Sequence, residues 1–236
     1  MTGGSRGIGK AISIGLAKKN INVAVGYNSG QTNAERVCAE IENFGINAIP
    51  IFVDLTKKVS IEDAFSKINK LFGQINILIN NAAIHIETDY LNISEAEWDE
   101  IQAVNIKAPF LITQLVLPDM LKNKYGKIVN IASIAASTGG VKSIPYAASK
   151  AGLVNLTKSL ARLYSKEGIC TFCINPNIVK TDMASNIDIK GAIKSIPANR
   201  IGHCEDISKL TSFLCSDDAN YLTGQTFNPN GAERLF

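Results

Sequence analysis

A tyrosine and a lysine, Tyr146 and Lys150, stand four residues apart in a segment with a helical pattern. Residues at positions i and i+4 are neighbours on one helical face, so this spacing sets a phenol beside an ammonium. A fixed cation favours the ionised form of a phenol, and we expect Lys150 to lower the Tyr146 pKa from about 10 toward working pH. The phenol can then exchange a proton with a carbonyl or alcohol oxygen. Alone, the pair is a weak signal, because such spacing arises by chance in many helices.

Two further polar residues strengthen this signal. Ser133 follows the predicted strand 127–131 and precedes Tyr146 by thirteen residues. Its hydroxyl can hydrogen-bond a substrate oxygen as charge develops there. Asn105 lies in a predicted helix, where a buried amide needs partners, and it can hold a water that relays protons to Lys150. Taken singly, each residue would more often be a helix cap or a satisfied buried polar group.

A glycine cluster occupies residues 2–9, directly before an amphipathic segment. Glycines allow a tight turn and let a pyrophosphate approach main-chain N–H groups at a helix N-terminus. Such a cluster is often only a turn, but the helix and strand that follow it favour a dinucleotide site. The expected loop contacts are Gly3, Ser5, Arg6, Gly7, Ile8 and Gly9.

The end of the next predicted strand indicates which dinucleotide binds. Sites that select NAD usually place a carboxylate there for the ribose 2′-hydroxyl. Residues 25–29 contain no acid, and Arg6 can instead meet a 2′-phosphate. Asn28 and Ser29, next to Tyr27, can donate hydrogen bonds to it. We therefore expect NADP(H) rather than NAD(H), the alternative being that Arg6 is a solvated surface residue.

Two later turns should complete the cofactor site. Asp54 and Leu55 follow an apolar run, and the Asp54 carboxylate can accept from the adenine amino group. A helix N-cap or a turn is the alternative role for Asp54. The run at 80–83 follows the next strand, and its small residues would let the loop pass close beneath the cofactor. The candidates in it are Asn81, Ala82 and Ala83.

These residues are set within a regular alternation of apolar runs and amphipathic segments. The predicted strands are 23–26, 48–53, 75–79, 127–131, 171–174 and 225–228. The predicted helices are 9–19, 32–44, 60–72, 95–122, 146–165 and 204–215. This order predicts an α/β fold, a doubly wound parallel sheet with helices on both faces and right-handed crossovers. Ligands should bind beyond the carboxyl ends of the strands.

Composition fits a single domain over residues 1–236. Hydrophobic residues make up 46% of the chain and charged residues 19%, which excludes a disordered chain. No apolar run approaches the roughly 20 residues of a membrane span, and no signal peptide is visible. The net charge of +3 gives no case for nucleic acid or an anionic membrane as a partner.

The cysteines and histidines predict neither a disulfide framework nor a metal site. Five cysteines make an odd count without framework spacing, which favours a reducing, cytoplasmic compartment. Cys170 and Cys173 have C-x-x-C spacing, but three residues apart on a strand their thiols point to opposite faces. His85 and His203 lack partners at ligand spacing.

The glycine loop begins at Thr2, which leaves no room for the strand that should lead into it. In a doubly wound sheet that strand is central, and its two neighbours would lack ladder partners without it. We expect that the natural chain begins upstream and that Met1 is the last residue of a largely missing first strand. The alternative is a genuine but destabilised or inactive product.

Together these features resemble the short-chain dehydrogenase/reductase family over essentially the whole chain. The matching residues are T-G-x-x-x-G-x-G at 2–9, N-N-A-A at 80–83, Asn105, Ser133, Tyr146 and Lys150. The resemblance implies a Rossmann-like sheet of order 3-2-1-4-5-6-7, an Asn-Ser-Tyr-Lys tetrad, a ribose held by Lys150, and a homotetramer. It also implies a nicotinamide site lined by Pro176, Ile178 and Thr181. The chain departs from the family at Asn177 and Ala83, where glycines are usual.

Within the family the chain is most similar to the 3-oxoacyl-acyl-carrier-protein reductases of fatty acid synthesis. The similarity lies in residues 3–9, 130–133, 146–153 and 222–225. It implies reduction of an acyl-thioester ketone to a secondary alcohol, with an acyl carrier protein as a partner. Such a carrier is acidic, so a basic surface should receive it. The candidate lysines are Lys122, Lys124, Lys127 and Lys166, although solvated helix ends explain them equally well.

Two segments leave other substrates open. Substrate choice should lie in a lid at 182–202, which is a few residues shorter than in these reductases, and the tail 228–236 lacks their glycine-rich ending. An enzyme for a small alcohol, a sugar or a secondary-metabolite ketone is the alternative, and activity with acetoacetyl thioesters separates the two. A non-catalytic nucleotide-binding subunit is a third hypothesis. The missing strand favours it, but the intact proton-transfer residues oppose it.

Overall fold

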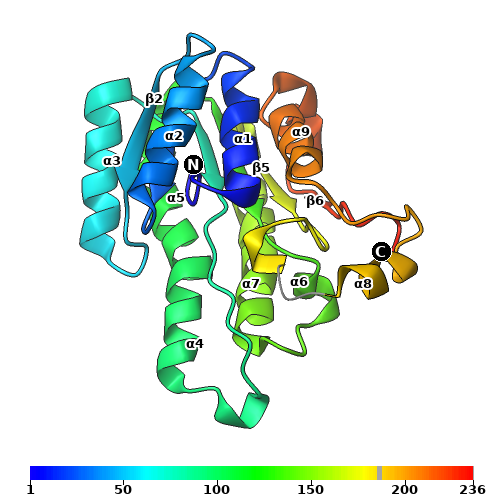
Figure 1. The fold of residues 1–236 in the computed structure, drawn as a ribbon. Helices are drawn as coiled ribbons and strands as arrows, with labels where there is room; N and C mark the ends of the chain where they lie inside the picture. Colours follow the sequence, from blue (N-terminus) through cyan, green and yellow to red (C-terminus); the bar gives the residue numbers. More distant parts are fainter. Residues whose placement is uncertain (185–187, 236) are drawn as a thin grey trace.

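A parallel sheet with helices on both faces forms the molecule (Figure 1). The computed structural model describes residues 1–184 and 188–235. The strands are β1 (Val23–Tyr27), β2 (Ala48–Phe52), β3 (Ile77–Asn80), β4 (Gly126–Ile131), β5 (Ile169–Ile174) and β6 (Thr226–Phe227). The main helices are α1 (Gly7–Ala17), α2 (Gln31–Glu42), α3 (Lys58–Phe72), α4 (Glu95–Gln102), α5 (Ala108–Asn123), α7 (Ile144–Tyr164) and α9 (Cys204–Leu214). Two short helices, α6 (Ala135–Thr138) and α8 (Ile189–Ser195), lie in the loops after β4 and β5.

Each predicted strand and helix is present, with shifts of a few residues at its ends. The predicted helix 95–122 is wrong as one continuous helix, because a π-helical segment, Ala103–Lys107, separates α4 from α5. A π-helical turn widens the helix and is often found at functional sites. Asn105 lies at its centre, so the interruption coincides with one of the candidate residues.

The sheet divides into two ladders, β1–β2 and β3–β4–β5–β6, and all of their pairings are parallel. Met1 and Thr2 lie between the two ladders. The Thr2 N–H donates to the Ile79 carbonyl at 3.0 Å, and the Gly26 N–H donates to the Met1 carbonyl at 2.9 Å. The spatial order is therefore β2-β1-(residues 1–2)-β3-β4-β5-β6, which is the predicted order with only the end of the first strand present.

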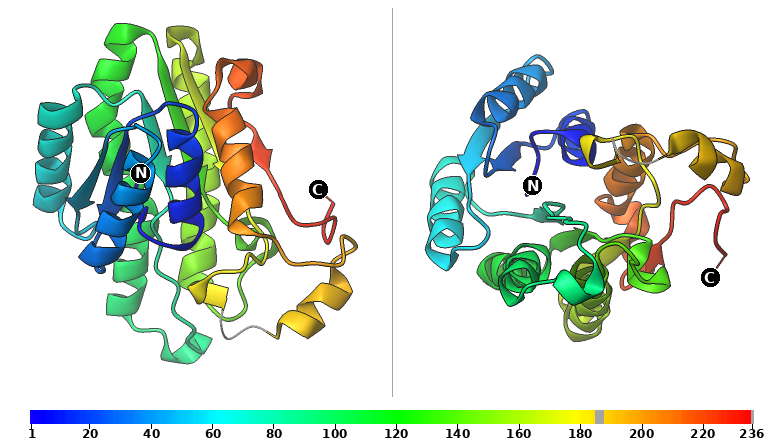
Figure 2. Two further views of the ribbon diagram at one scale, coloured as in Figure 1. Left: turned by 45° about the horizontal axis from the view of Figure 1, so that its top comes forward. Right: turned by 60° about the horizontal axis from the view of Figure 1, so that its bottom comes forward.

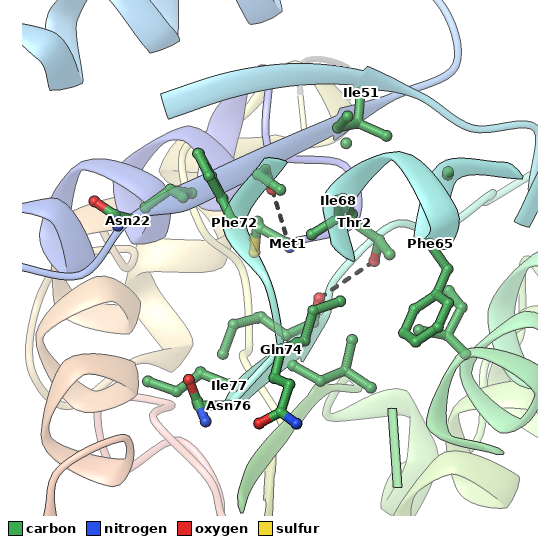
Figure 3. A pocket seen from close by; sticks show the side chains of 18 of the residues that line it. Met1, Thr2, Asn22, Ile51, Phe65, Ile68, Phe72, Gln74, Asn76 and Ile77 are labelled. Carbon is green, nitrogen blue, oxygen red and sulfur yellow. Dashed lines mark hydrogen bonds between the residues drawn. The ribbon is translucent and has the colours of Figure 1, made fainter. Parts of the chain in front are cut away.

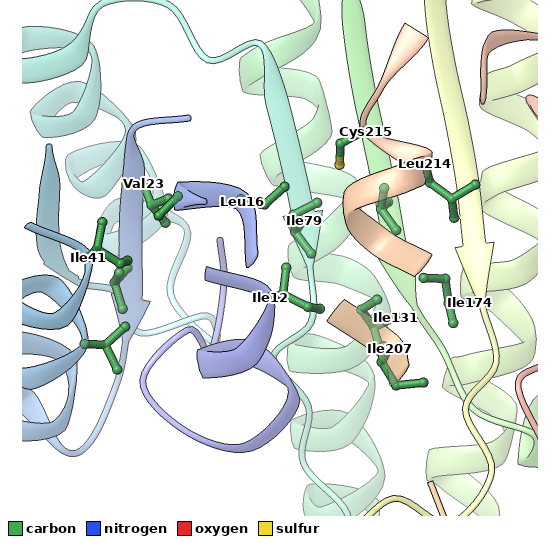
Figure 4. Close-up of a cluster of buried hydrophobic side chains, with 14 of the residues drawn as sticks. Ile12, Leu16, Val23, Ile41, Ile79, Ile131, Ile174, Ile207, Leu214 and Cys215 are labelled. Atoms are coloured by element: carbon green, nitrogen blue, oxygen red, sulfur yellow. The ribbon is translucent and has the colours of Figure 1, made fainter. Parts of the chain in front are cut away.

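The largest hydrophobic cluster lies on the face of the sheet that α1, α2 and α9 cover (Figure 4). Ile12 and Leu16 of α1 meet Ile79 and Ile131 of the sheet and Ile207 of α9 there. Complete burial of such a side chain stabilises the fold by about 1.5–3 kcal/mol. Clusters on the opposite face join the sheet to α3, α5 and α7. The two turned views show helices on both sides of the sheet, with α8 standing away from it near the carboxyl end (Figure 2).

The two cysteines of the C-x-x-C spacing lie on opposite faces of β5, as predicted. Cys170 packs in the cluster under α9, whereas Cys173 packs in the cluster under α7. Both thiols are free and buried. Among the residues that the structure describes, no helix is both long and apolar enough to cross a membrane.

Candidate active site

The first turns of α7 position Tyr146 and Lys150. Pro145 stands at the start of this helix, where a proline fits because its missing N–H has no partner to lose. The Lys150 ammonium reaches the end of β4 and donates to the Ile131 carbonyl at 2.8 Å. It lies 5.5 Å from the centroid of the Tyr146 ring. Phenol and ammonium are therefore neighbours, but the described hydrogen bond of the ammonium is to the main chain.

Burial governs the acidity of both groups. It lowers the pKa of Lys150 to about 8, since a charged ammonium is poorly solvated there. It also raises the pKa of Tyr146, an effect that hydrogen bonding with Ser133 only partly offsets. The expectation that Lys150 brings the Tyr146 pKa down is therefore wrong for the structure as it stands. Desolvation of the phenolate is the larger effect, and the ammonium is directed to Ile131.

Ser133 lies just beyond β4, on the same side of the site as Tyr146. Its hydroxyl accepts from the Ala135 N–H at 3.2 Å and is near enough to the phenol to favour its ionised form by hydrogen bonding. Asn130, near the end of β4, is fixed by two side-chain bonds: it accepts from Asn80 and donates to Thr157, each at 2.8 Å. These buried side-chain hydrogen bonds link β3, β4 and α7 beneath the site.

Asn105 is completely buried, and its amide is occupied by protein groups. Its side-chain oxygen accepts from the Ile84 N–H at 2.8 Å, and its nitrogen donates to the Ile84 carbonyl at 3.0 Å. The nitrogen also donates to the Ser149 hydroxyl at 3.1 Å. Asn105 thus joins the loop after β3 to α7, one residue from Lys150. Its role as the holder of a relay water stays a prediction.

His85 is a site residue that the sequence reasoning missed. Its ring lies 4.9 Å from the Tyr146 ring, centroid to centroid, at an interplanar angle of 89°. Such edge-to-face contacts are favourable between aromatic rings. In the sequence, the lack of a partner at ligand spacing argues only against a metal-binding role for His85. Its neighbour Ile84, held by Asn105, directs the following residue toward α7, and this contact has no signature in the sequence.

The glycine loop is so compact that side chains are excluded from it. A Cβ on Gly9 would lie 2.0 Å from the Gly3 carbonyl oxygen, and Gly3 itself has a positive φ of +60°. Gly7 also has a positive φ, +52°, and a Cβ on it would lie 3.3 Å from the Thr181 side chain. The loop therefore packs back on itself and faces Thr181, and Ile8 lies in the first turn of α1 behind it.

The N-terminus of α1 is open to an anion. Its N-cap residue, Arg6, is extended and makes no side-chain cap hydrogen bond, and the first turn contains no acidic residue. N–H groups at such a terminus lack helical partners and favour negative charge. The Arg6 side chain is 71% exposed and lies 3.9 Å from Asp182, a weak surface pair. Ser5 precedes it in the same loop.

The residues that follow β3 hold the glycine loop in place through hydrogen bonds. The Asn81 side chain donates to the carbonyls of Thr2 and Gly3, both at 3.1 Å. The N–H groups of Asn81 and Ala82 donate to the Thr2 hydroxyl at 3.0 and 3.1 Å. The side chain of Asn81 is thus committed to the loop, and Ala82 and Ala83 are half-buried beside it.

Just after β2, Asp54 forms a turn, which is the alternative to its expected contact with the adenine. Asp54 accepts from the Thr56 N–H at 3.0 Å and from the Lys57 ammonium at 2.9 Å. Hydrogen bonds from Thr56, then from Lys57, lower the pKa of Asp54 to about 2. The side chain of Leu55 is buried in the core, so only its main chain can meet a ligand.

The remaining predicted cofactor residues lie at the carboxyl ends of β1 and β5. Tyr27 packs edge-on against Phe52 at 6.0 Å, and Asn28 and Ser29 after it are exposed. After β5, the Pro176 carbonyl accepts from the Ile134 N–H at 2.9 Å, which joins this loop to the one carrying Ser133. The Ile178 carbonyl accepts from the Gly202 N–H at 2.9 Å, so the residues just before and at the end of the expected lid 182–202 are neighbours. Residues 185–187 of that lid lie outside the described residues.

Lys127 corrects the predicted basic surface, since it cannot serve as a docking residue. Its side chain is 1% exposed, and its ammonium donates to the Ser216 carbonyl at 3.1 Å and lies 3.4 Å from Asp217. Lys127 thus binds the main chain just after the end of α9 from inside the molecule. Lys122, Lys124 and Lys166 are exposed.

Comparisons with known proteins find similar sequences and a similar structure over most of the chain. The sequence model of the short chain dehydrogenase family matches residues 1–191. A 3-oxoacyl-acyl-carrier-protein reductase of Staphylococcus epidermidis is 36% identical over 98% of this chain and 96% of its own length. The corresponding reductase of Aquifex aeolicus is 37% identical over 98% and 94%. A crystal structure from Agrobacterium tumefaciens, provisionally assigned as a gluconate dehydrogenase, superposes with a TM-score of 0.94 at 26% identity and covers 100% of this chain and 95% of its own.

Proposed function

The chain belongs to the short-chain dehydrogenase family, and on that premise we propose that it reduces a ketone to a secondary alcohol with NADP(H). The observation that carries the proposal is the grouping of Tyr146, Ser133 and Lys150 at the end of β4. The glycine loop lies beyond the neighbouring end of β3. In doubly wound sheets this edge is where dinucleotides and their substrates bind.

The loop and the start of α1 fit a dinucleotide. The glycines leave no side chain between the loop and a pyrophosphate, and the open N–H groups of α1 are suited to its charge. Arg6, Asn28 and Ser29 would hold a 2′-phosphate, and the lack of an acid after β1 favours NADP(H). Asp54, Leu55, Asn81, Ala82 and Ala83 would border the adenosine and the bridging ribose, and Pro176, Ile178 and Thr181 would border the nicotinamide. When bound, this cofactor supplies the hydride.

Tyr146 would act as the proton donor. Its raised pKa keeps the phenol protonated near neutral pH, which is the form needed to protonate the oxygen of a ketone. Ser133 would donate a hydrogen bond to the same oxygen as negative charge develops on it. The two hydroxyls lie within hydrogen-bonding reach of each other, so a ketone oxygen placed beside them could accept from both.

Lys150 would return a proton to Tyr146 after each turnover. With a pKa of about 8, its ammonium exchanges protons readily near neutral pH. It would also hold a ribose hydroxyl of the cofactor. Asn105 would keep a water in line between Lys150 and the solvent, while its side chain fixes Ile84 and Ser149.

A 3-oxoacyl thioester is the substrate class that the relatives favour, because those named above are 3-oxoacyl-acyl-carrier-protein reductases. We propose that the segment 182–202 closes over it as a lid and that an acyl carrier protein delivers it. The exposed lysines Lys122, Lys124 and Lys166 are candidates for the carrier's docking surface. A homotetramer is the assembly we propose.

A sugar acid or small polyol is the second candidate substrate. It is favoured by the likeness to the structure provisionally assigned as a gluconate dehydrogenase. The deciding experiment follows NADPH oxidation with acetoacetyl thioesters and NADP⁺ reduction with gluconate. Turnover of the thioester alone supports the first proposal, turnover of gluconate alone replaces it, and absence of any carbonyl or alcohol turnover contradicts both.

A further inference from the structure

His85 lies beside Tyr146 with its hydrogen-bonding groups unused. The two rings meet edge to face, with their centroids 4.9 Å apart, and the His85 side chain is half-buried. In the part of the chain that the structure describes, neither ring nitrogen of His85 forms a hydrogen bond, and neither is enclosed without a partner. An imidazole carries at least one N–H donor in any protonation state. This donor is therefore open to a ligand that reaches the phenol of Tyr146.

Hydrogen bonds on both sides hold His85 in this position. On one side, the Asn105 amide binds the N–H and the carbonyl of Ile84 at 2.8 and 3.0 Å. On the other side, the Thr88 N–H donates to the Lys142 carbonyl at 3.2 Å. The segment 84–88 is thus fastened at both ends. Its imidazole has less conformational freedom to lose when a ligand binds, which favours affinity.

The aromatic contact alone does not require a histidine at this position. A phenylalanine could make the same edge-to-face contact with the Tyr146 ring. What the imidazole adds is a polar group next to the place where the ketone would lie, between Tyr146 and Ser133. A substrate that covers this group removes its water, and an N–H donor left without a partner is costly. His85 therefore favours a substrate that offers an acceptor beside the ketone.

A separate cavity of about 440 Å³ lies between β1 and β3, toward the amino ends of these strands (Figure 3). It is lined by Met1, Thr2 and apolar residues of α3 and α5, and it takes the place expected for the first strand of the sheet. His85 and Tyr146 do not line it. The substrate of Tyr146 must therefore approach at the carboxyl ends of the strands, where His85 lies.

We propose that His85 is a substrate-binding residue that donates a hydrogen bond to a second oxygen of the substrate, the thioester carbonyl of a 3-oxoacyl thioester. One carbon separates the two carbonyls of such a substrate, so the second oxygen lies close to the ketone that Tyr146 protonates. This assignment rests on the proposed ketone reduction. It narrows the substrate to ketones that carry an acceptor beside the reacting carbonyl.

Kinetics with two matched substrates tests the proposal. One is the acetoacetyl thioester of N-acetylcysteamine, and the other is its analogue in which a methylene group replaces the thioester carbonyl. His85→Phe keeps an aromatic ring against Tyr146 and loses the donor. Its kcat/KM for the thioester should fall about tenfold, mainly through a higher KM, as expected for the loss of one hydrogen bond to the bound substrate. Its kcat/KM for the analogue should change less than about twofold.

His85→Gln separates the donor from the ring. Its side chain has N–H donors but no ring, so the ratio of thioester to analogue kcat/KM should stay closer to that of the unmodified protein than in His85→Phe. Asp89→Asn, an exposed change on the same loop, should leave both substrates unchanged. Circular dichroism and NADPH titration check that each variant is folded and binds the cofactor.

Two results would overturn the proposal alone. Equal losses for both substrates in His85→Phe would show that His85 acts only through Tyr146. Unchanged kinetics for both would place His85 outside the substrate site. Turnover of neither substrate by the unmodified protein would instead contradict the proposed ketone reduction and, with it, this proposal.

Discussion

Glu233, near the carboxyl end of the chain, accepts a hydrogen bond from the side-chain amide of Asn177, in the loop after β5. Its other carboxylate oxygen accepts from the Ser195 hydroxyl of α8 at 3.4 Å. The Ala198 N–H donates to the Gly231 carbonyl at 3.0 Å nearby. Two departures from the family pattern, at Asn177 and in the tail, are therefore in contact. Through them the tail is joined to both the proposed nicotinamide loop and the proposed lid.

Glu233→Ala should release this link and alter substrate binding more than chemistry. We expect KM for the ketone to rise several-fold while kcat changes less, because the proton-transfer residues do not contact Glu233. Steady-state kinetics with the best substrate measures both. Glu167→Ala removes an exposed carboxylate from the turn after α7 and should change neither. A fall in kcat at constant KM would show that the tail acts on the chemical step instead.

Asn105→Ala should destabilise the fold as well as slow turnover. It leaves the buried main-chain groups of Ile84 without their side-chain partners, at about 1–3 kcal/mol for each unsatisfied group. Urea unfolding measures the loss. Asn155→Ala, on the exposed side of α7, should stay within about 0.5 kcal/mol of the unmodified protein. Unchanged stability in Asn105→Ala would mean that the loop finds other partners.

Arg6→Ala should weaken NADPH binding about tenfold, as expected for loss of one charge-assisted hydrogen bond to a phosphate. NADH lacks the 2′-phosphate, so its affinity should change little. Fluorescence titration with both cofactors makes the comparison. Lys19→Ala removes an exposed charge just after α1 and is the matched control. Equal losses for both cofactors would remove the argument for NADP(H).

The periodic parts of the sequence predicted the fold well, for a physical reason. Buried strands and amphipathic helices have patterns that their own residues carry, so β4 and α7 were predicted to within a few residues of their ends. The grouping of Ser133 with Tyr146 followed, because the end of a parallel strand and the start of the next helix meet at one edge of the sheet.

What the sequence could not predict depends on burial and on distant partners. The direction of the Tyr146 pKa was wrong, since desolvation depends on packing from several elements. The contact of His85 with Tyr146 arises from the path of a loop, and the burial of Lys127 depends on the position of α9. The π-helical turn at Asn105 has no periodic signature.

The most direct test of the account is the rate of carbonyl reduction by Tyr146→Phe. This change removes the phenolic hydroxyl and keeps the ring against His85. Turnover should fall by about 10²–10⁴-fold, the usual contribution of a general acid, while NADPH affinity stays unchanged in a fluorescence titration. A variant that reduces the ketone at the rate of the unmodified enzyme would contradict the assignment of Tyr146 as the proton donor.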